Sequence, residues 1–287
     1  EFRLDVPESA RRLEVDAVWE DGDVEPLFEY DLADVRARSA ELDRKRRSLA
    51  SIPMPSGEIV ALTQGHRDVE GYRNSIIPGV GNMRRYLTAA GIDADAIRSV
   101  LDFGCGSGRL LTGWMLEESD RALAGCDPNA ALAGWARENL PARVRIDHTS
   151  LLPPLPYRDA EFDLAFAISV FTHLKFATQR VWARELARVV APGGALLVTL
   201  HGPFYAGLFA PERATELERE GHFELEGAAD GSNEFASFHL PQAVEALFDE
   251  FEAVAYFPEG RIRDKRVLFP LAGLQDVHVL RRRSTTP

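Results

Sequence analysis

The stretch Val100–Arg109 reads V-L-D-F-G-C-G-S-G-R and contains the most informative pattern of the chain. Its apolar first half predicts a strand buried on both faces, and the run L-L-T-G-W-M that follows predicts a helix. Between them, Gly104, Gly106 and Gly108 let the backbone turn tightly. Such a turn, here named the glycine elbow (Gly104–Gly108), leaves bare main chain and free N–H groups for an electron-rich ligand. The stretch therefore predicts a nucleotide site.

The spacing of these glycines narrows the choice of ligand. A dinucleotide fingerprint has the pattern G-x-G-x-x-G, whereas this chain has G-x-G-x-G followed by Arg109. Arginine in place of the third glycine counts against a pyrophosphate, so an NAD-dependent oxidoreductase is the less favoured alternative. Asp127 ends the next predicted strand, where a carboxylate accepts hydrogen bonds from both hydroxyls of a ribose. Its structural alternative is to cap the helix that follows.

The composition is that of an ordinary globular protein. The 287 residues are 45% hydrophobic and 27% charged, with a formal net charge of -12 and a pI near 5.1. This charge creates no field that attracts phosphate backbones, so we expect no nucleic-acid partner. No apolar run approaches the ~18 residues of a membrane span, and the polar first residues lack the apolar core of a signal peptide. We therefore expect a cytoplasmic protein without a membrane span.

The two cysteines, Cys105 and Cys126, both fall at the carboxyl ends of predicted strands beside the glycine elbow. In a reducing compartment, two small apolar thiols in a core are favoured over a disulfide or a metal pair. We therefore assign no metal.

The first 56 residues indicate an appendage. Apolar residues alternate from Phe2 to Tyr30 around the turn E-D-G-D, which predicts a small β arm. Asp31 then caps a predicted amphipathic helix, and the run I-P-M-P-S-G ends it. We therefore divide the chain into an N-terminal appendage (1–56), an irregular connector (57–71) and a main domain (72–287).

Within the main domain, predicted strands alternate with predicted helices. Such alternation implies a doubly wound α/β fold with a mostly parallel sheet, in which ligands bind at the carboxyl ends of the strands. Besides the strand before the elbow, we expect strands at 122–126, 144–146, 162–170, 195–200, 251–257 and 276–280, and helices at 82–90, 129–140, 176–189 and 242–251.

Two further segments support a family assignment. One reads L-P-Y-R-D-A-E-F-D-L-A-F-A-I-S-V-F-T-H-L from Leu155 to Leu174, and the other reads E-L-A-R-V-V-A-P-G-G-A-L-L-V-T from Glu185 to Thr199. With F-G-C-G-S-G-R-L-L before them, these motifs have the order and spacing of class I S-adenosylmethionine-dependent methyltransferases of types 11 and 12. The chain resembles that family over residues 72–282. The resemblance implies S-adenosylmethionine as cofactor and a Rossmann-like, seven-stranded sheet with an antiparallel last strand.

The resemblance also implies which residues hold the cofactor. Main chain at the elbow would contact the methionine part, Asp127 the ribose, Pro128 one face of adenine, and the backbone near Ile168 the amino group. Relatives often place an acidic residue near Ser150 and Leu151 to meet the adenine amino group, so main-chain groups would take that role here. The implied cofactor residues are Asp102, Gly104, Cys105, Gly106, Asp127, Pro128, Ser150, Leu151 and Ile168.

Three histidines are candidates for a general base. Methyl transfer is an in-line displacement, so positioning the reactants is the main task, and only a hydroxyl acceptor gains much from a base. His173 follows the predicted fourth strand, His201 the fifth, and His239 lies in a later loop, all near the carboxyl edge of the sheet. We expect His201 or His239 to face the acceptor, with a structural role equally open for His173.

The expected function is methyl transfer to a small or medium acceptor, through a hydroxyl, amine or carboxylate. The segment G-L-Q-D-V-H-V-L (273–280) resembles relatives that accompany glycosyltransferases and natural-product pathways, which favours a saccharide or secondary metabolite. One alternative is a catalytically inactive, cofactor-binding subunit with the same fold. The appendage would either cover the acceptor or form the contact of a homodimer.

Overall fold

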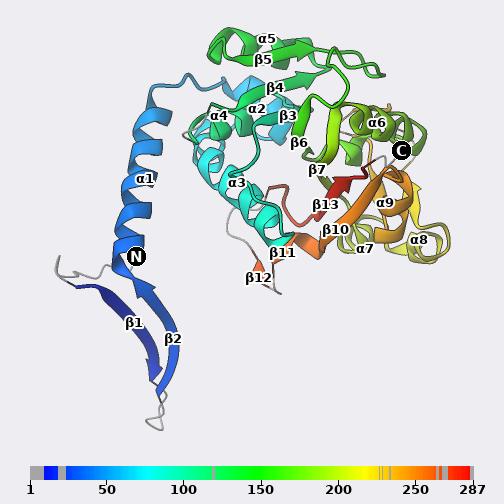
Figure 1. Cartoon of the computed structure of the whole chain (residues 1–287). Helices are drawn as coiled ribbons and strands as arrows, with labels where there is room; N and C mark the ends of the chain where they lie inside the picture. The colour runs from blue at the N-terminus through cyan, green and yellow to red at the C-terminus, as the bar shows by residue number, and fades with distance from the viewer. Residues whose placement is uncertain are drawn as a thin grey trace. The chain divides into compact units, whose positions relative to one another are not determined.

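The computed structural model describes residues 10–18, 24–117, 120–225, 227, 229–232, 234–262, 265–266 and 271–284, in two compact units, 1–52 and 53–287. The first unit contains the antiparallel strands β1 (Arg12–Val18) and β2 (Val24–Asp31) and the helix α1 (Leu32–Ala50) (Figure 1). The predicted β arm and helix are confirmed. The part of the predicted arm before residue 10 and the predicted turn at residues 20–23 lie outside the described residues.

The second unit is built on a seven-stranded sheet with the order β10-β13-β7-β6-β3-β4-β5. Its strands run parallel except β13, which is antiparallel to both of its neighbours. The predicted fold class and the reversed last strand are therefore confirmed. The strands are β3 (Ser99–Phe103), β4 (Ala122–Asp127), β5 (Val144–His148), β6 (Phe162–Ala167), β7 (Val190–Leu200), β10 (Phe251–Phe257) and β13 (Asp276–Arg282).

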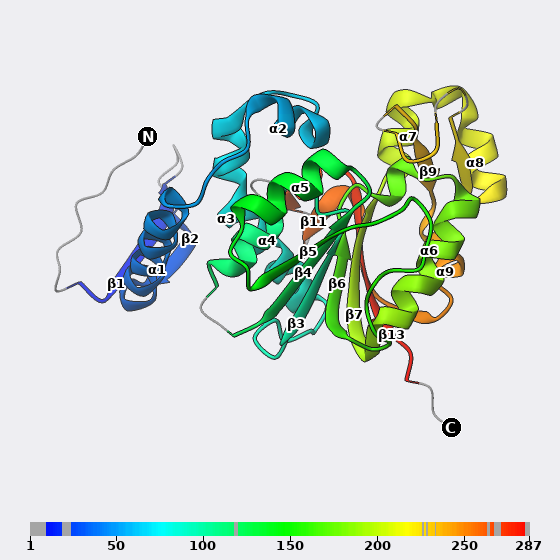
Figure 2. The same ribbon diagram turned by 90° about the horizontal axis from the view of Figure 1, so that it is seen from above.

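Helices cover both faces of this sheet (Figure 2). One apolar core joins the sheet to α3 (Val69–Ala89), α4 (Arg109–Met115) and α5 (Ala130–Asn139). The other joins it to α6 (Phe176–Val189) and α9 (Pro241–Leu247). Side chains that alternate along a buried strand enter the two cores in turn, as Val100 and Leu101 do on β3. Among the described residues, no helix is long and apolar enough to cross a membrane.

The expected irregular connector is helical. Residues 57–64 form α2 (Gly57–Gln64), and α3 begins at Val69, well before the helix predicted at 82–90. The side chain of Ser56 accepts a hydrogen bond from the Ile59 N–H, and Asp68 accepts one from the Gly71 N–H. Both residues are typical N-caps, so the sequence contains a start signal for each helix, although the hydrophobic pattern alone does not reveal it.

A segment between β7 and α9 forms a small layer of its own, here named the insertion (203–239). It has a separate apolar core that includes Ala206, Leu217, Phe223 and Phe238. We predicted no element in it from the sequence. Its elements are α7 (Pro203–Phe209), η2 (Pro211–Arg213), α8 (Ala214–Glu220), β8 (His222–Glu224) and β9 (Ser237–His239). Outside the insertion, the remaining short elements of the second unit are η1 (Phe171–His173), η3 (Pro258–Gly260), β11 (Arg261–Ile262) and β12 (Lys265–Arg266).

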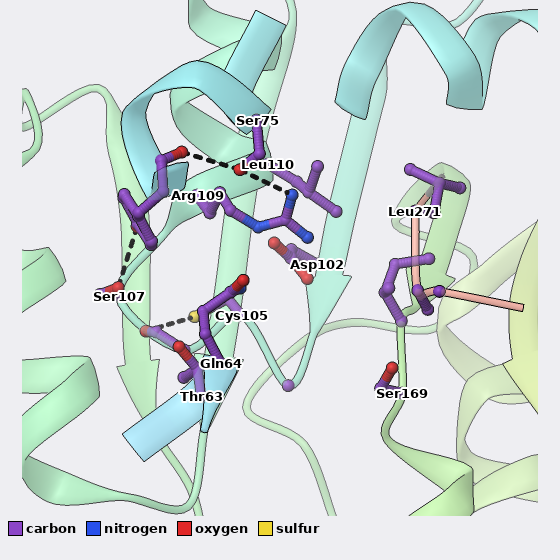
Figure 3. Close-up of a pocket in the computed structure, with 16 residues that line it drawn as sticks. Thr63, Gln64, Ser75, Asp102, Cys105, Ser107, Arg109, Leu110, Ser169 and Leu271 are labelled. Carbon is purple, nitrogen blue, oxygen red and sulfur yellow. Dashed lines mark hydrogen bonds between the residues drawn. The ribbon is translucent and has the colours of Figure 1, made fainter. Parts of the chain in front are cut away.

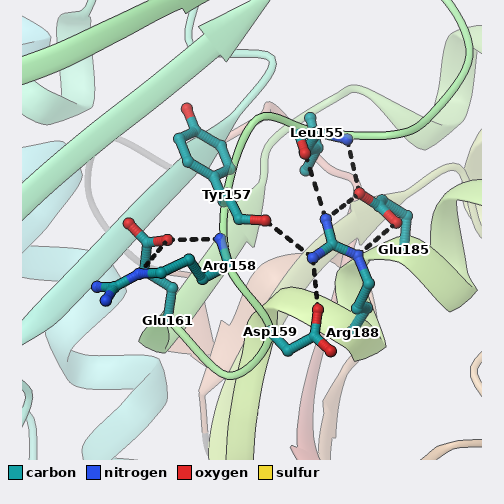
Figure 4. Close-up of polar contacts among 7 residues, drawn as sticks. All are labelled: Leu155, Tyr157, Arg158, Asp159, Glu161, Glu185 and Arg188. Carbon is teal, nitrogen blue, oxygen red and sulfur yellow. Dashed lines mark hydrogen bonds and ion pairs between the residues drawn. The ribbon is translucent and has the colours of Figure 1, made fainter.

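An ion-pair cluster fixes the proline-rich loop that leads into β6 (Figure 4). The guanidinium of Arg188, on α6, donates to both carboxylate oxygens of Glu185 and to Asp159. It also donates to the main-chain carbonyls of Leu155 and Tyr157. These five hydrogen bonds hold the loop on the helix, and we name the cluster the Arg188 brace.

Candidate functional site

The glycine elbow has the backbone that its sequence predicts. Gly104 and Gly106 have φ values of 78° and 55°, a region that side chains disfavour. The N–H groups of Gly104 and Cys105 both donate to the Cys126 carbonyl, which ties the elbow to the end of β4. A Cβ atom at Gly106 would lie 2.7 Å from the Thr63 Cγ2 atom. The elbow therefore has no space for a larger residue at this point.

A cavity of about 310 Å³ opens in front of the elbow, at the carboxyl edge of the sheet (Figure 3). This volume is in the range of small-molecule sites. The cavity is lined by five of the predicted cofactor residues, Asp102, Gly104, Cys105, Gly106 and Ile168.

Two opposite charges lie on one wall of the cavity. Asp102 is 3% exposed, and no described residue donates a hydrogen bond to its carboxylate. Burial raises its pKa well above the ordinary value, and the nearby Arg109 opposes that shift. The guanidinium of Arg109 lies beside this carboxylate (Figure 3), and its one hydrogen bond within the described residues goes to the Ser75 hydroxyl at 3.3 Å. Both groups retain hydrogen-bonding capacity for a ligand.

Asp127 lies behind the elbow at the end of β4. Its Oδ2 atom accepts from the Gly106 N–H and its Oδ1 atom from the Asn129 N–H, both at 2.8 Å. Burial raises its pKa, and these two hydrogen bonds oppose the shift. Each carboxylate oxygen accepts more than one hydrogen bond, so both stay able to receive a ribose hydroxyl. The N-cap of α5 is Asn129 and not Asp127, so the capping alternative does not apply, although both hydrogen bonds of Asp127 hold main chain in place. Asp127 does not line the cavity, and its contact with the ribose stays a prediction.

The predicted adenine residues lie at an open edge. Pro128 and Ser150 are exposed, and Leu151 is 51% exposed, with its carbonyl accepting from the Trp182 indole N–H. None of the three lines the cavity in front of the elbow. Their contact with the cofactor stays a prediction.

The cysteines are buried and unpaired with each other. Burial raises the pKa of both Cys105 and Cys126, so neither is an activated thiolate. Within the described part of the chain, no cluster of three or more histidine, cysteine, aspartate or glutamate residues has the geometry of a metal site.

The three candidate histidines occupy different surroundings. His173 is half-buried on η1, and its Nδ1 atom lies 3.0 Å from the Phe235 carbonyl. That bond assigns the proton to Nδ1 and the lone pair to Nε2, while burial lowers the pKa of the ring. His201 is partly exposed; burial, together with the nearby His173, lowers its pKa to about 4.

His239 belongs to a buried hydrogen-bond network. It is 2% exposed, and its Nε2 atom lies 2.8 Å from the Gln179 Oε1 atom. The Gln179 amide nitrogen donates to the carbonyls of Phe171 and Leu174, so Nε2 of His239 is the donor in their bond. Burial lowers the pKa of His239 to about 3, so the ring stays neutral. None of the three histidines lines the cavity in front of the elbow.

Sequence reasoning missed one wall of the cavity. Thr63, Gln64 and Tyr72, from α2 and α3, line it beside the elbow, and the Tyr72 hydroxyl is 2.9 Å from the hydroxyl of Ser107 in the elbow. The N-caps Ser56 and Asp68 would have predicted the two helices, but not that they line the cavity. A second missed residue is Ser169, which lines the cavity with φ 58° and donates its N–H to the Thr199 hydroxyl. A non-glycine residue held in this conformation at a cavity is typical of functional sites.

The methyltransferase domain family matches residues 101–198 of the chain. A demethylmenaquinone methyltransferase from Deinococcus radiodurans is 30% identical over 206 residues, which are 68% of this chain and 81% of that protein. A probable S-adenosylmethionine-dependent methyltransferase from Mycolicibacterium smegmatis is 34% identical over 185 residues, 58% of this chain and 70% of that protein. For several other curated relatives, the chain spans only 20% to 39% of their length.

A solved structure has a similar fold. The crystal structure of the PH0226 protein from Pyrococcus horikoshii aligns with a TM-score of 0.53 at 18% identity, over 78% of this chain and 96% of that one. At this identity the likeness shows the fold alone.

Proposed function

Because the chain belongs to the class I S-adenosylmethionine-dependent methyltransferases, we propose that it transfers the cofactor's methyl group to a small or medium-sized acceptor. The acceptor atom that we propose is the oxygen or nitrogen of a hydroxyl, amine or carboxylate, on a saccharide or a secondary metabolite. Family membership makes S-adenosylmethionine the cofactor and removes the NAD-dependent alternative.

The observation that supports this proposal most is the pair of opposite charges beside the elbow. The amino-acid end of S-adenosylmethionine carries an ammonium and a carboxylate. The buried Asp102 carboxylate, which no described residue pairs by a hydrogen bond, is suited to the ammonium, and the Arg109 guanidinium is suited to the carboxylate. The charges of this wall therefore fit the cofactor, and we propose that the elbow supplies main-chain contacts and that Asp127, behind the elbow, holds the ribose.

The remaining task of the chain is to orient the acceptor and to move its proton. When bound, the cofactor supplies an electrophilic methyl group on a sulfonium. Walls on both sides of the cavity fix the reactants, and orientation of this kind contributes ~7 to 11 kcal/mol to catalysis. For a hydroxyl acceptor, we propose His173 as the base, because its Nε2 lone pair is not used by a described residue and its ring is half-buried, whereas that of His239 is only 2% exposed. The choice of His173 differs from the expectation from the sequence, which favoured His201 or His239.

Binding and turnover separate this proposal from the inactive-subunit alternative. The binding test is isothermal titration of the purified protein with S-adenosylhomocysteine, for wild type and Gly106→Val. We expect micromolar binding to wild type and none to the variant, because a side chain there strains the backbone and meets Thr63. The activity test is transfer of labelled methyl into a panel of phenols, sugars, amines and carboxylates. Cofactor binding without transfer to any member would favour the inactive subunit, and equal binding by both proteins would contradict the site.

Other expectations from the sequence stay predictions. These are the cytoplasmic location, the absence of a nucleic-acid partner, the homodimer contact and the division of the chain at residues 56 and 71.

A further inference from the structure

A ladder of three rings leads from the carboxyl end of β7 along α7. His201 and Tyr205 have ring centroids 4.8 Å apart, and Tyr205 stacks on Phe209 at 5.6 Å with an angle of 2° between the rings. Tyr205 is partly buried, whereas Phe209 is 59% exposed. The ladder therefore begins at the edge of the sheet where the ligand cavity lies and ends on an exposed ring that a ligand could cover.

The middle ring touches the wall of the cavity. The Tyr205 hydroxyl accepts a hydrogen bond from the Leu274 N–H at 3.2 Å, and a Cβ atom at Gly273 would lie 2.7 Å from its oxygen. Gly273 lines the cavity in front of the elbow. The apolar face of α7 is thus continuous with the proposed cofactor site through a single layer of main chain.

The exposed side of α7 is apolar and uncharged. Of seven large hydrophobic side chains exposed in the described part of the chain, three lie on this helix: Phe204 (38%), Leu208 (60%) and Phe209 (59%). The segment from His201 to Pro211 contains no Asp, Glu, Lys or Arg, although 27% of all residues are charged. Exposed apolar side chains gathered in this way are typical of a binding surface.

We propose that α7 binds the non-reacting part of the methyl acceptor, and that this part is an uncharged, mainly apolar ring system. This inference rests on the proposed function and narrows its acceptor. A bare saccharide needs hydrogen-bonding partners for its hydroxyls, and the exposed side chains of α7 provide none. A planar ring stacks on Phe209 and buries Leu208 without leaving polar groups unpaired.

A matched pair of ligands tests this choice. The protein, saturated with S-adenosylhomocysteine, is titrated with 2-naphthol and separately with methyl glucoside, and binding is followed by ligand-observed NMR. The variants are Leu208→Ser with Phe209→Ser, and as a control Leu152→Ser, which removes a leucine of similar exposure (56%) from the loop between β5 and β6. Binding of S-adenosylhomocysteine is measured in each protein, and sedimentation gives its oligomeric state.

We expect 2-naphthol to bind wild type and the control equally and the α7 variant at least about fivefold more weakly, since the lost apolar contact contributes about 1 kcal/mol or more. Equal naphthol binding by the α7 variant, no naphthol binding to wild type, or stronger binding of methyl glucoside would each overturn the inference. So would conversion of a dimer into monomers by the α7 substitutions, because a second copy would then be the occupant. Failure of the proposed function gives a different result, the loss of S-adenosylhomocysteine binding to wild type.

Discussion

Two arginines of this chain have opposite surroundings. Arg188 makes five hydrogen bonds, to two carboxylates and two carbonyls, and holds the loop before β6 (Figure 4). Arg109 lies beside the carboxylate of Asp102 (Figure 3), yet its one hydrogen bond within the described residues goes to the Ser75 hydroxyl. In the Arg188 brace, the guanidinium and the carboxylates bind one another, whereas Asp102 and Arg109 on the cavity wall can still form hydrogen bonds with a ligand. Unused capacity at a buried charge is costly to the fold, and it is what a charged ligand needs.

The largest expected effect belongs to the brace. Arg188→Met leaves Glu185, whose side chain is 9% exposed, with only the Leu155 N–H and without its ion-pair partner, so we expect a loss of about 3 kcal/mol in the free energy of unfolding. Affinity for S-adenosylhomocysteine should change less than twofold. Urea unfolding and titration calorimetry measure the two quantities. Arg184→Met, an exposed site on the same helix, is the control. A large loss of affinity at unchanged stability would remove the distinction between the two arginines.

Asp102→Asn should have the reverse effect. The amide keeps the shape of the side chain but loses the charge that pairs with the cofactor's ammonium, so we expect affinity for S-adenosylhomocysteine to fall by about 10- to 100-fold. The free energy of unfolding at pH 7.5 should stay equal or rise. A neutral amide costs less to bury than a carboxylate to which no described residue donates a hydrogen bond. Calorimetry and thermal unfolding test both parts. Unchanged affinity would show that Asp102 is a structural residue.

The histidines give a comparison of the same kind within one residue type. Each of His173 and His239 uses one ring nitrogen in a hydrogen bond, but His173 is half-buried near the sheet edge, whereas His239 is 2% exposed and bonds Gln179 in the core. With a hydroxyl acceptor from the panel, His173→Ala should lower turnover at least about tenfold with nearly unchanged cofactor affinity. His239→Ala should mainly lower stability, and His201→Ala serves as the intermediate case. A loss of cofactor affinity equal to the loss of turnover in His173→Ala would refute the role as base.

The smallest expected effect is a pH dependence. Burial raises the pKa of Asp102 in the folded protein above its ordinary value near 4, so the folded state binds this proton more tightly than the unfolded chain does. The contribution of Asp102 to the free energy of unfolding is therefore fully present at low pH, and it is lost as the pH rises through the pKa that Asp102 has in the folded protein. Asp102→Asn lacks this contribution, so its advantage over wild type in urea unfolding should grow from pH 4.5 to pH 8. A constant difference would contradict the raised pKa.

The strands and the elbow could be predicted because the signal for each is local: a short run of apolar residues marks a buried strand, and closely spaced glycines mark a tight turn. Short apolar runs predicted the strands, and the glycines at 104, 106 and 108 predicted the turn, whereas the antiparallel direction of the last strand was implied only by the family resemblance. The wall formed by Tyr72 and Thr63 could not be predicted in this way, because hydrophobic periodicity does not show which helix faces the elbow. The insertion was missed for another reason: its helices are about two turns long, and the alternation in β8 and β9 covers three residues each.

The insertion has its own apolar core, separate from the two cores that flank the sheet. Substitutions within it can therefore accumulate without loosening the packing that shapes the elbow. If α7 binds the acceptor as proposed, such a partition lets a descendant of this chain change what it methylates while it keeps its cofactor site, and exchanging this segment alone is then a rational route to altered selectivity.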